Sequence, residues 1–485
     1  MDLTHHSASE QLHALESGEV SSRELTAAHL ERIARHPEYN AVVTADHEGA
    51  LAAAATADER RARGRADGPP PGPLLGLPIV LKDSLETEGL RTTCGAADLA
   101  AHIPARDADA VARLRAAGAV ILGKTNTPPM CQDLQTGNPL FGATPNPHDP
   151  RRTAGGSSGG AAAAVAARLS SLGIGSDLGG SLRLPGHYCG VYSLRPSYGI
   201  VPTRGHIPRP PGWLSASDML TVGPVARSAA DLDLALGVLA GPSPDDSAAW
   251  RLELPAPRRE RLRDYRIGIW ADDPYCPVDS ETRALLEGVC KTLRDTGAQV
   301  DESTRPVGMA ASDRLFQTLM FAGSSASASP EAFAGELAAA RDLAPDDLHP
   351  GAAYLRARTM PHRDWLLANE ERQQLRRQWA AYFGDVDVLI TPAAPTAAVP
   401  DQTGVPVPER YITVDGERRS YWDQTSWLNL AGPANLPAAT LPAGSTADGL
   451  PLGLQIIGPY LADHTVTHLA ALLAQAGCAR PGQKR

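Results

Sequence analysis

Apolar runs and amphipathic stretches follow one another along this chain, in an order that predicts strands separated by helices. The run LLGLPIVLKDS over residues 74–84 predicts a short buried strand that ends at Lys82. Residues 107–126, DADAVARLRAAGAVILGKTN, predict a helix, a glycine stop and a second buried strand. A strand over 266–270 and a helix over 281–300 repeat this kind of unit. The alternation predicts an α/β fold, a sheet with helical cover.

Longer patterns complete the prediction of elements. Residues 7–37 predict a helix, with Ser22 as a cap. Residues 331–383 predict a mainly helical segment, after which residues 385–395 return to strand. Residues 59–73 combine charge, glycine and proline, which is typical of a surface linker. No shift in composition separates domains.

The composition of the whole chain excludes several classes of protein. The formal net charge of the 485 residues is −10, so the chain lacks the basic surface expected for a nucleic-acid partner. No apolar run reaches the roughly 18 residues needed to span a membrane, and the polar N-terminus lacks a signal-peptide core. The six cysteines form no CxxC pair, which indicates reduced thiols and a cytoplasmic location. His464 and His468 lie four residues apart but without the glutamate of an HExxH motif, so we expect no zinc site.

Two glycine- and serine-rich stretches, GGSSGG over 155–160 and GSDLGGS over 175–181, need a different explanation from a linker. The first is followed at once by AAAAVAARLSS, a strong helix former, so it lies at a helix N-terminus. Neither stretch has the spacing of a P-loop or of GxGxxG. GGSSG fits the nucleophile-elbow pattern GxSxG around Ser157, but no apolar strand precedes it.

The remaining interpretation treats the two stretches as one catalytic site. A helix and a short segment join Ser157 to Ser181, and this connection is short enough to bring the two serines together. The backbone N–H groups of DLGGS can form a concave nest for an oxyanion. A serine nucleophile also needs a base, and Lys82 ends an apolar strand that would bury it. Lysine acts as a base where burial disfavours its charged form.

These motifs resemble those of the amidase signature family of serine hydrolases. The resemblance is carried by GLPIVLKDS, GGSSGG and GSDLGGSLRLP, with 75 residues from Lys82 to Ser157 and 24 from Ser157 to Ser181. It extends over about residues 5–470 and includes GAVILGKTNTPP, CGVYSLRPSYGIVP and NLAGPANLPAATLPAG. It implies the amidase signature fold, a mixed central β-sheet covered by helices on both faces. It also implies one domain over 1–485, with a signature core over about 74–240, a helical insertion over about 331–383 and a C-terminal part of the core over about 385–460.

The resemblance also implies roles for individual residues. Ser181 would be the nucleophile that forms an acyl-enzyme, Ser157 a bridging serine with a cis peptide bond, and Lys82 the base. The N–H groups of the catalytic loop would form the oxyanion hole, and three neighbours would support it. The hole residues are Leu178, Gly179, Gly180 and Ser181, and the supporting residues are Ser158, Asp177 and Arg183.

The function implied is hydrolysis of the C–N bond of a small-molecule carboxamide, with no metal or organic cofactor. Two alternatives use the same core: the glutaminase subunit of a tRNA-dependent amidotransferase, which needs partner subunits, and an acyl transferase, in which an amine replaces water. A non-catalytic binding protein on this scaffold is disfavoured because all three catalytic residues are present. We expect a small-molecule amide as partner and neither nucleic acid nor membrane, and leave a homodimer open.

The substrate pocket is predicted in less detail. By the resemblance, Thr127 to Gln132 line the acyl pocket, which places Cys131 and Gln132 among the candidate contacts. Cys131 is then either a reactive thiol or a packing residue of the pocket wall. Trp213, Trp422 and Trp427 lie in predicted loops, where they either line the pocket for an aromatic or apolar substrate or pack in the core.

Overall fold

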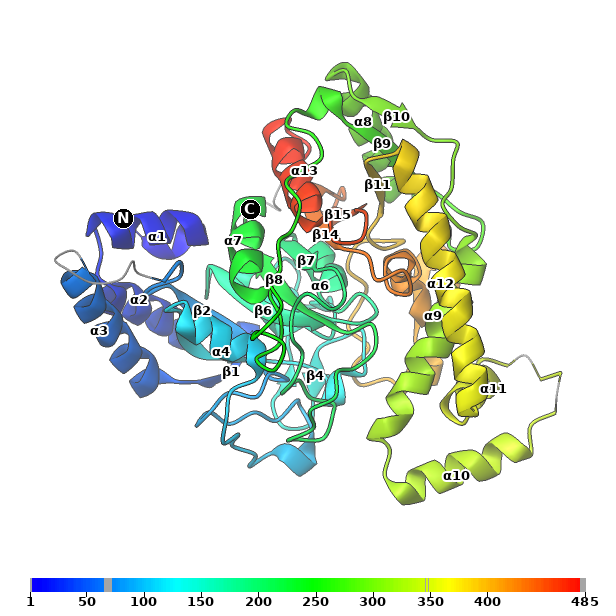
Figure 1. Cartoon of the computed structure of the whole chain (residues 1–485), viewed down its shortest axis with the longest axis horizontal. Helices are drawn as coiled ribbons and strands as arrows, with labels where there is room; N and C mark the ends of the chain where they lie inside the picture. The colour runs from blue at the N-terminus through cyan, green and yellow to red at the C-terminus, as the bar shows by residue number, and fades with distance from the viewer. Residues whose placement is uncertain (1, 65–71, 345, 348, 480–485) are drawn as a thin grey trace.

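A computed structural model describes residues 2–64, 72–344, 346–347 and 349–479. Its central feature is a mixed sheet of eleven described strands (Figure 1). In sheet order the strands are β1 (Val42–Ala45), β3 (Val120–Thr125), β2 (Pro78–Lys82), β6 (Leu172–Asp177), β8 (Thr221–Ala226), β7 (Tyr192–Arg195), β14 (Ala438–Ser445), β15 (Pro451–Ile457), β11 (Val388–Pro392), β9 (Arg266–Ile269) and β10 (Gln299–Asp301). Two small ribbons pair β4 (Gly137–Asn138) with β5 (Gly142–Ala143), and β12 (Tyr411–Val414) with β13 (Glu417–Ser420).

The sheet contains parallel and antiparallel pairs. β3, β2 and β6 run parallel to one another, as do β11, β9 and β10. The strands between these two groups pair antiparallel. The carboxyl ends of β2 and β6 therefore lie at the same edge of the sheet, which is where open α/β sheets place ligands.

Helices surround the sheet (Figure 1). They are α1 (Ala8–Ser17), α2 (Ser22–Arg35), α3 (His47–Gly64), α4 (Asp109–Ala116), α5 (Gly159–Ala166), α6 (Arg183–Cys189), α7 (Ala229–Leu239), α8 (Ser280–Asp295), α9 (Met309–Ser324), α10 (Pro330–Arg341), α11 (Pro350–Arg358), α12 (His362–Asp385) and α13 (Asp463–Gln475). Among the described helices, none has both the length and the apolar character needed to cross a membrane.

The side chains of β2 show that both faces of the sheet are covered. Ile79 and Leu81 belong to a buried cluster that includes residues of α4, α7 and α13, whereas Val80 belongs to a cluster with residues of α2, α3 and α5. Successive side chains of a strand point to opposite faces, so each face of β2 packs against its own helices. The predicted α/β fold, a mixed central sheet with helices on both faces, is confirmed.

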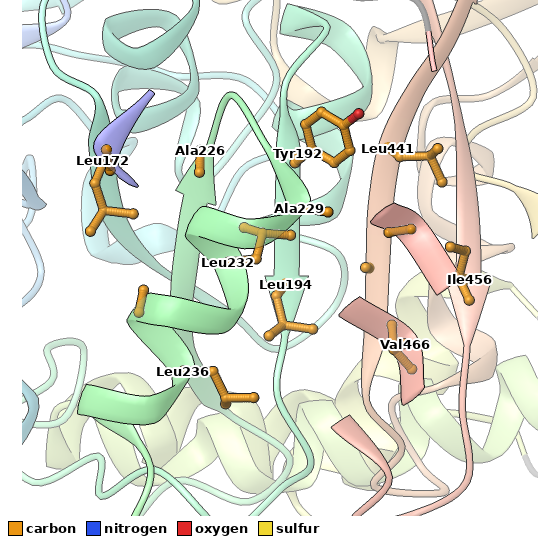
Figure 2. Close-up of a cluster of buried hydrophobic side chains, with 14 of the residues drawn as sticks. Leu172, Tyr192, Leu194, Ala226, Ala229, Leu232, Leu236, Leu441, Ile456 and Val466 are labelled. Carbon is orange, nitrogen blue, oxygen red and sulfur yellow. The ribbon is translucent and has the colours of Figure 1, made fainter. Parts of the chain in front are cut away.

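Figure 2 shows how one of these clusters is built over the middle of the sheet. Leu232 and Leu236 of α7 lie over β7 and β8, and Val466 of α13 lies over β14 and β15. All three side chains are fully buried. Full burial of such a side chain contributes about 1.5–3 kcal/mol, so these contacts fix both helices on the sheet.

Two predicted elements have different boundaries in the structure. The helix expected over 7–37 is two helices, because Gly18 takes a left-handed conformation (φ 78°) that ends α1. Ser21, not Ser22, caps α2 through a reciprocal bond pattern with Glu24. The linker predicted over 59–73 begins later, since α3 continues to Gly64; its residues 65–71 lie outside the described residues.

The later elements follow the predicted order. Helices α10, α11 and α12 occupy most of the segment predicted to be helical, and β11 follows. In Figure 1 these helices lie at one side of the molecule, away from α1–α3. The division of the chain into core and insertion stays a prediction.

Candidate active site

The predicted base and the bridging serine are in direct contact. Lys82 Nζ donates to Ser157 Oγ at 2.6 Å and to Ser176 Oγ at 3.0 Å. Lys82 is the last residue of β2, and Ser176 lies near the end of the parallel strand β6, so strand pairing brings the two together. Lys82 is fully buried, and no carboxylate of the described residues lies within ion-pair distance of it.

The serine-rich loop before α5 is held by backbone and hydroxyl bonds. The Gly156–Ser157 peptide bond is cis, as the resemblance implied. Thr127 Oγ1 donates to the Ser157 carbonyl at 2.9 Å. The Ser158 N–H donates to the Ser181 carbonyl at 3.1 Å, so the loops that carry the two predicted catalytic serines lie against each other. Ser158 Oγ donates to the Ser176 carbonyl at 3.1 Å, which ties this loop to β6.

Ser181 lies in the turn between β6 and α6 and is partly exposed, in contrast to buried Ser157 and Lys82. Among the described residues, no hydrogen bond is assigned to its hydroxyl. Substrate can therefore approach Ser181 from solvent while the lysine stays shielded.

The predicted oxyanion hole needs one correction. The Gly180 N–H donates to Asp177 Oδ1 at 2.9 Å, so it is already bonded. No acceptor is assigned in the described chain to the N–H groups of Leu178, Gly179 and Ser181, which leaves these three as candidate donors. Gly180 instead shapes the turn: its φ is +100°, and a Cβ there would lie 2.6 Å from Leu428 Cδ1.

A buried ionic cluster fixes this turn. Arg183 Nε and Nη2 each donate to Asp177 at 2.9 Å, and Arg195 Nη1 donates to the Asp177 carbonyl at 2.7 Å. All three side chains are fully buried. Burial alone would raise the pKa of Asp177, but Arg183 and then Arg195 hold that pKa well below its usual range. The carboxylate stays ionised and binds the turn at three points: Gly180, Leu182 and Arg183.

The predicted substrate contacts fall into three groups. Cys131 is half-buried and Gln132 exposed, in the loop after β3, where Thr127 Oγ1 lies 3.6 Å from Cys131 Sγ. Trp213 and Trp422 are 42% and 48% exposed, so both are available to a ligand. Of the two roles that the sequence left open for Trp427, the structure favours packing in the core. Its side chain is fully buried, its Nε1 donates to the Cys276 carbonyl at 3.0 Å, and its ring packs edge-on against Trp270.

Sequence reasoning missed several contacts that hold the site, among them those of Ser176, Thr127 and Arg195. Ser176, the second partner of Lys82, lies inside the GSDLGGS stretch but was not singled out. Thr127 and Arg195 lie in GKTNTPP and SLRPS, two stretches quoted for the resemblance. Lys124, one strand away, is also buried, and burial lowers its pKa to about 8. Its apolar strand context resembles that of Lys82, so strand context alone does not separate the two lysines; the family motif and the contact with Ser157 do.

Comparison with known proteins gives one family for nearly the whole chain. Residues 24–467 match the family model described as Amidase. The chain is 34% identical over 477 residues to a glutamyl-tRNA(Gln) amidotransferase subunit from Thermosynechococcus vestitus, covering 93% of this chain and 94% of that protein. It is 37% identical to the protein of the same name from Roseiflexus castenholzii, covering 92% and 90%.

Solved structures agree with this assignment. One chain of a protein complex described as revealing the origins of an s-triazine catabolic enzyme matches with a TM-score of 0.80 and 29% identity, covering 98% of this chain and all of that chain. A bacterial aryl acylamidase of the amidase signature family matches with a TM-score of 0.79 and 25% identity, covering 97% and 96%. From the sequence match and the shared fold, this chain belongs to the amidase family.

Proposed function

We propose that this chain cleaves the C–N bond of a carboxamide through an acyl-enzyme on Ser181. The observation that carries the proposal is the 2.6 Å hydrogen bond between buried Lys82 and Ser157, beside the Ser181 turn. Lys82 is fully buried, and among the described residues its amine contacts serine hydroxyls and no carboxylate. This contact gives Lys82 the role of base in the proposal, with Ser157 as the group from which it takes a proton.

The reaction begins with two proton transfers. Neutral Lys82 accepts the proton of Ser157, and Ser157 accepts the proton of Ser181 as the Ser181 oxygen attacks the amide carbonyl carbon. A hydroxyl both donates and accepts, so Ser157 can relay the proton. No hydrogen bond joins the two serine hydroxyls among the described residues, so this link forms when substrate binds, as catalytic hydrogen bonds often do.

Collapse of the tetrahedral intermediate breaks the C–N bond. The proton returns from Lys82 through Ser157 to the departing nitrogen, which leaves as ammonia or an amine. Water then attacks the acyl-enzyme by the same relay and releases the carboxylic acid. The N–H groups of Leu178, Gly179 and Ser181 stabilise the oxyanion in both halves, and the loss of one such donor costs about 10²–10³ in rate.

Two amides are candidate substrates: glutamine and a free small-molecule amide. The curated relatives named above are amidotransferase subunits, and this favours glutamine as the amide and partner subunits as the acceptors of its ammonia. The motifs alone left this role as an alternative, and the comparisons support it better than a free small-molecule amide. The aryl acylamidase likeness supports the small-molecule amide.

Two measurements separate these substrates. Glutaminase activity of the isolated chain, compared with its rates on aryl and aliphatic amides, identifies the amide. Co-purification with other subunits from the source cell tests the amidotransferase role. If the chain alone cleaves simple amides and no other subunits co-purify with it, the stand-alone amidase role is favoured over the amidotransferase role. A cytoplasmic location and a homodimer stay predictions within either role.

The chemistry itself is tested by Ser181→Ala. We expect this variant to fold as the parent does and to lose turnover of every amide, together with labelling by a fluorophosphonate. Ser171→Ala is a matched control, because Ser171 is a buried serine whose hydroxyl has no hydrogen-bond partner in the described chain. Full activity in Ser181→Ala would refute the acyl-enzyme.

A further inference from the structure

Two cysteines lie in contact next to the proposed active site. The sulfur atoms of Cys94 and Cys131 are 3.6 Å apart, and both point to one carbonyl, that of Ile207, at 3.8 and 4.0 Å. The sequence separates the two cysteines by 37 residues. No spacing rule would have paired them.

The backbone holds the two cysteines in place. The Met130 N–H, next to Cys131, donates to the Cys94 carbonyl at 2.9 Å. The Cys94 N–H donates to the carbonyl of Asp83 at 2.8 Å, and Asp83 follows Lys82 in the chain. Cys94 and Cys131 both have left-handed backbones, with φ of 48° and 59°. This backbone conformation is strained for residues other than glycine, so the surrounding structure fixes both cysteines.

The pair is asymmetric in access and in acidity. Cys94 is fully buried, whereas Cys131 is half-buried in the predicted acyl pocket. The hydrogen bond from the Cys94 thiol is the main cause that holds the pKa of Cys131 well below its usual range, and burial raises the pKa of Cys94. Cys131 is therefore the more exposed and the more acidic member of the pair, and Cys94 is the buried one.

We propose that Cys94 and Cys131 are a peroxide-sensitive thiol pair that forms a reversible disulfide beside the catalytic groups. The Cys131 thiolate attacks hydrogen peroxide, the O–O bond breaks, and Cys131 becomes a sulfenic acid as hydroxide leaves. The Cys94 sulfur then attacks Cys131 Sγ and displaces the sulfenic oxygen as water. The balance is two thiols and one hydrogen peroxide to one disulfide and two waters.

Formation of the disulfide alters the site through Thr127. A disulfide bond is about 2.05 Å long, so the sulfurs must approach by about 1.5 Å. Thr127 Oγ1 lies 3.6 Å from Cys131 Sγ and donates to the Ser157 carbonyl. Movement of Cys131 toward Cys94 therefore acts on the residue that positions Ser157. Because a misplacement of about 1 Å can cost about 10² in rate, we expect oxidation to lower amide cleavage at least tenfold. This second effect rests on the proposed function.

The test treats the full reduced chain with hydrogen peroxide, removes the excess, blocks free thiols and maps the peptides by mass spectrometry. We expect a cross-linked peptide that joins Cys94 to Cys131 and lacks two hydrogens, and a loss of activity that dithiothreitol restores. Cys94→Ser should keep its activity when reduced, give no cross-link, and show no loss that dithiothreitol reverses. Cys290→Ser, which removes a buried cysteine of α8, should behave as the parent does.

The formation of the disulfide and its effect on activity can be overturned independently of each other. Absence of the cross-link under peroxide that oxidises other cysteines overturns the proposal, as does the same reversible loss of activity in Cys94→Ser. A cross-link with undiminished activity overturns the effect through Thr127. If the reduced chain cleaves no amide, the proposed function fails, and the cross-link, read by mass alone, still supports or overturns the thiol pair.

Discussion

At the scale of single residues, the hydroxyl of Ser176, the second hydrogen-bond acceptor of Lys82, allows a test of how the proposed base is oriented. Ser176 accepts a hydrogen bond from Lys82 at 3.0 Å from the neighbouring strand. Ser176→Ala removes this bond and leaves Ser157 as the acceptor. One hydrogen bond contributes about 1 kcal/mol, so we expect kcat/KM for an amide substrate to fall roughly five- to tenfold.

Lys82→Met, which removes the proposed base, should lower kcat/KM by a factor on the order of 10⁴.

Lys124→Met is the control for Lys82→Met, because it removes another buried lysine. Lys124 is equally buried, but its Nζ donates to Thr87 and Thr92 instead of a serine of the site. We expect Lys124→Met to lose stability in urea unfolding while the folded protein keeps most of its activity. Equal loss of activity in both lysine variants would contradict the assignment of Lys82 as the base, and wild-type activity in Ser176→Ala would show that Ser176 has no part in orienting it.

At the scale of elements, the turn between β6 and α6 depends on one carboxylate. Asp177→Asn leaves the charges of Arg183 and Arg195 buried without their partner. Breaking a buried ion pair costs about 3–5 kcal/mol, so we expect a fall of that size in the free energy of unfolding. Activity should fall as well, because Asp177 also binds the N–H of Gly180 beside Ser181, the proposed nucleophile.

Asp387→Asn is the matched control for the turn. Asp387 is also buried and contacts three arginines, Arg258, Arg259 and Arg266, but these are 34–39% exposed and lie around β9. We expect a smaller loss of stability and no loss of activity in the folded protein. If Asp177→Asn were destabilised but fully active, the turn would not depend on the carboxylate for its catalytic shape.

The elements also show where sequence patterns reach their limit. Apolar runs predicted β2 and β3 well, because a short buried strand leaves a continuous apolar signal. The break at Gly18 was missed, since the helical periodicity continues on both sides of it. The sequence predicted a loop around Trp427 but could not show that the side chain is buried. Its packing against Trp270, which is distant in sequence, makes it a core residue.

At the scale of the whole molecule, the fold class was predictable but the strand order was not. The resemblance gave the mixed sheet, whereas no local pattern shows that β14 and β15 lie between β7 and β11. The same holds for the site. Matching motifs predicted Lys82, Ser157 and Ser181 as site residues, whereas Ser176 and the contact of Cys94 with Cys131 follow only from long-range pairing of strands and loops.

Acid stability is a property of the whole molecule because buried histidines lie at separate interfaces. Burial lowers the pKa of His29 in α2, His187 in α6 and His206 before β8 to about 4. Nε2 of His187 donates to the Thr396 carbonyl, and Nδ1 accepts from the Gly453 N–H, so the fold requires the neutral ring. In the unfolded chain a histidine has a pKa of about 6.5.

The unfolded chain therefore binds more protons than the folded one between about pH 6.5 and 4. The stability that these histidines contribute is complete above pH 6.5 and is lost as the pH falls toward 4, at up to about 3 kcal/mol per histidine. We expect the free energy of unfolding in urea to fall over this range, and His187→Asn to reduce the slope because it removes one titrating ring. His13→Asn, at an exposed position, should leave the slope unchanged. An equal slope in His187→Asn and the parent would mean that acid acts on this fold through other groups.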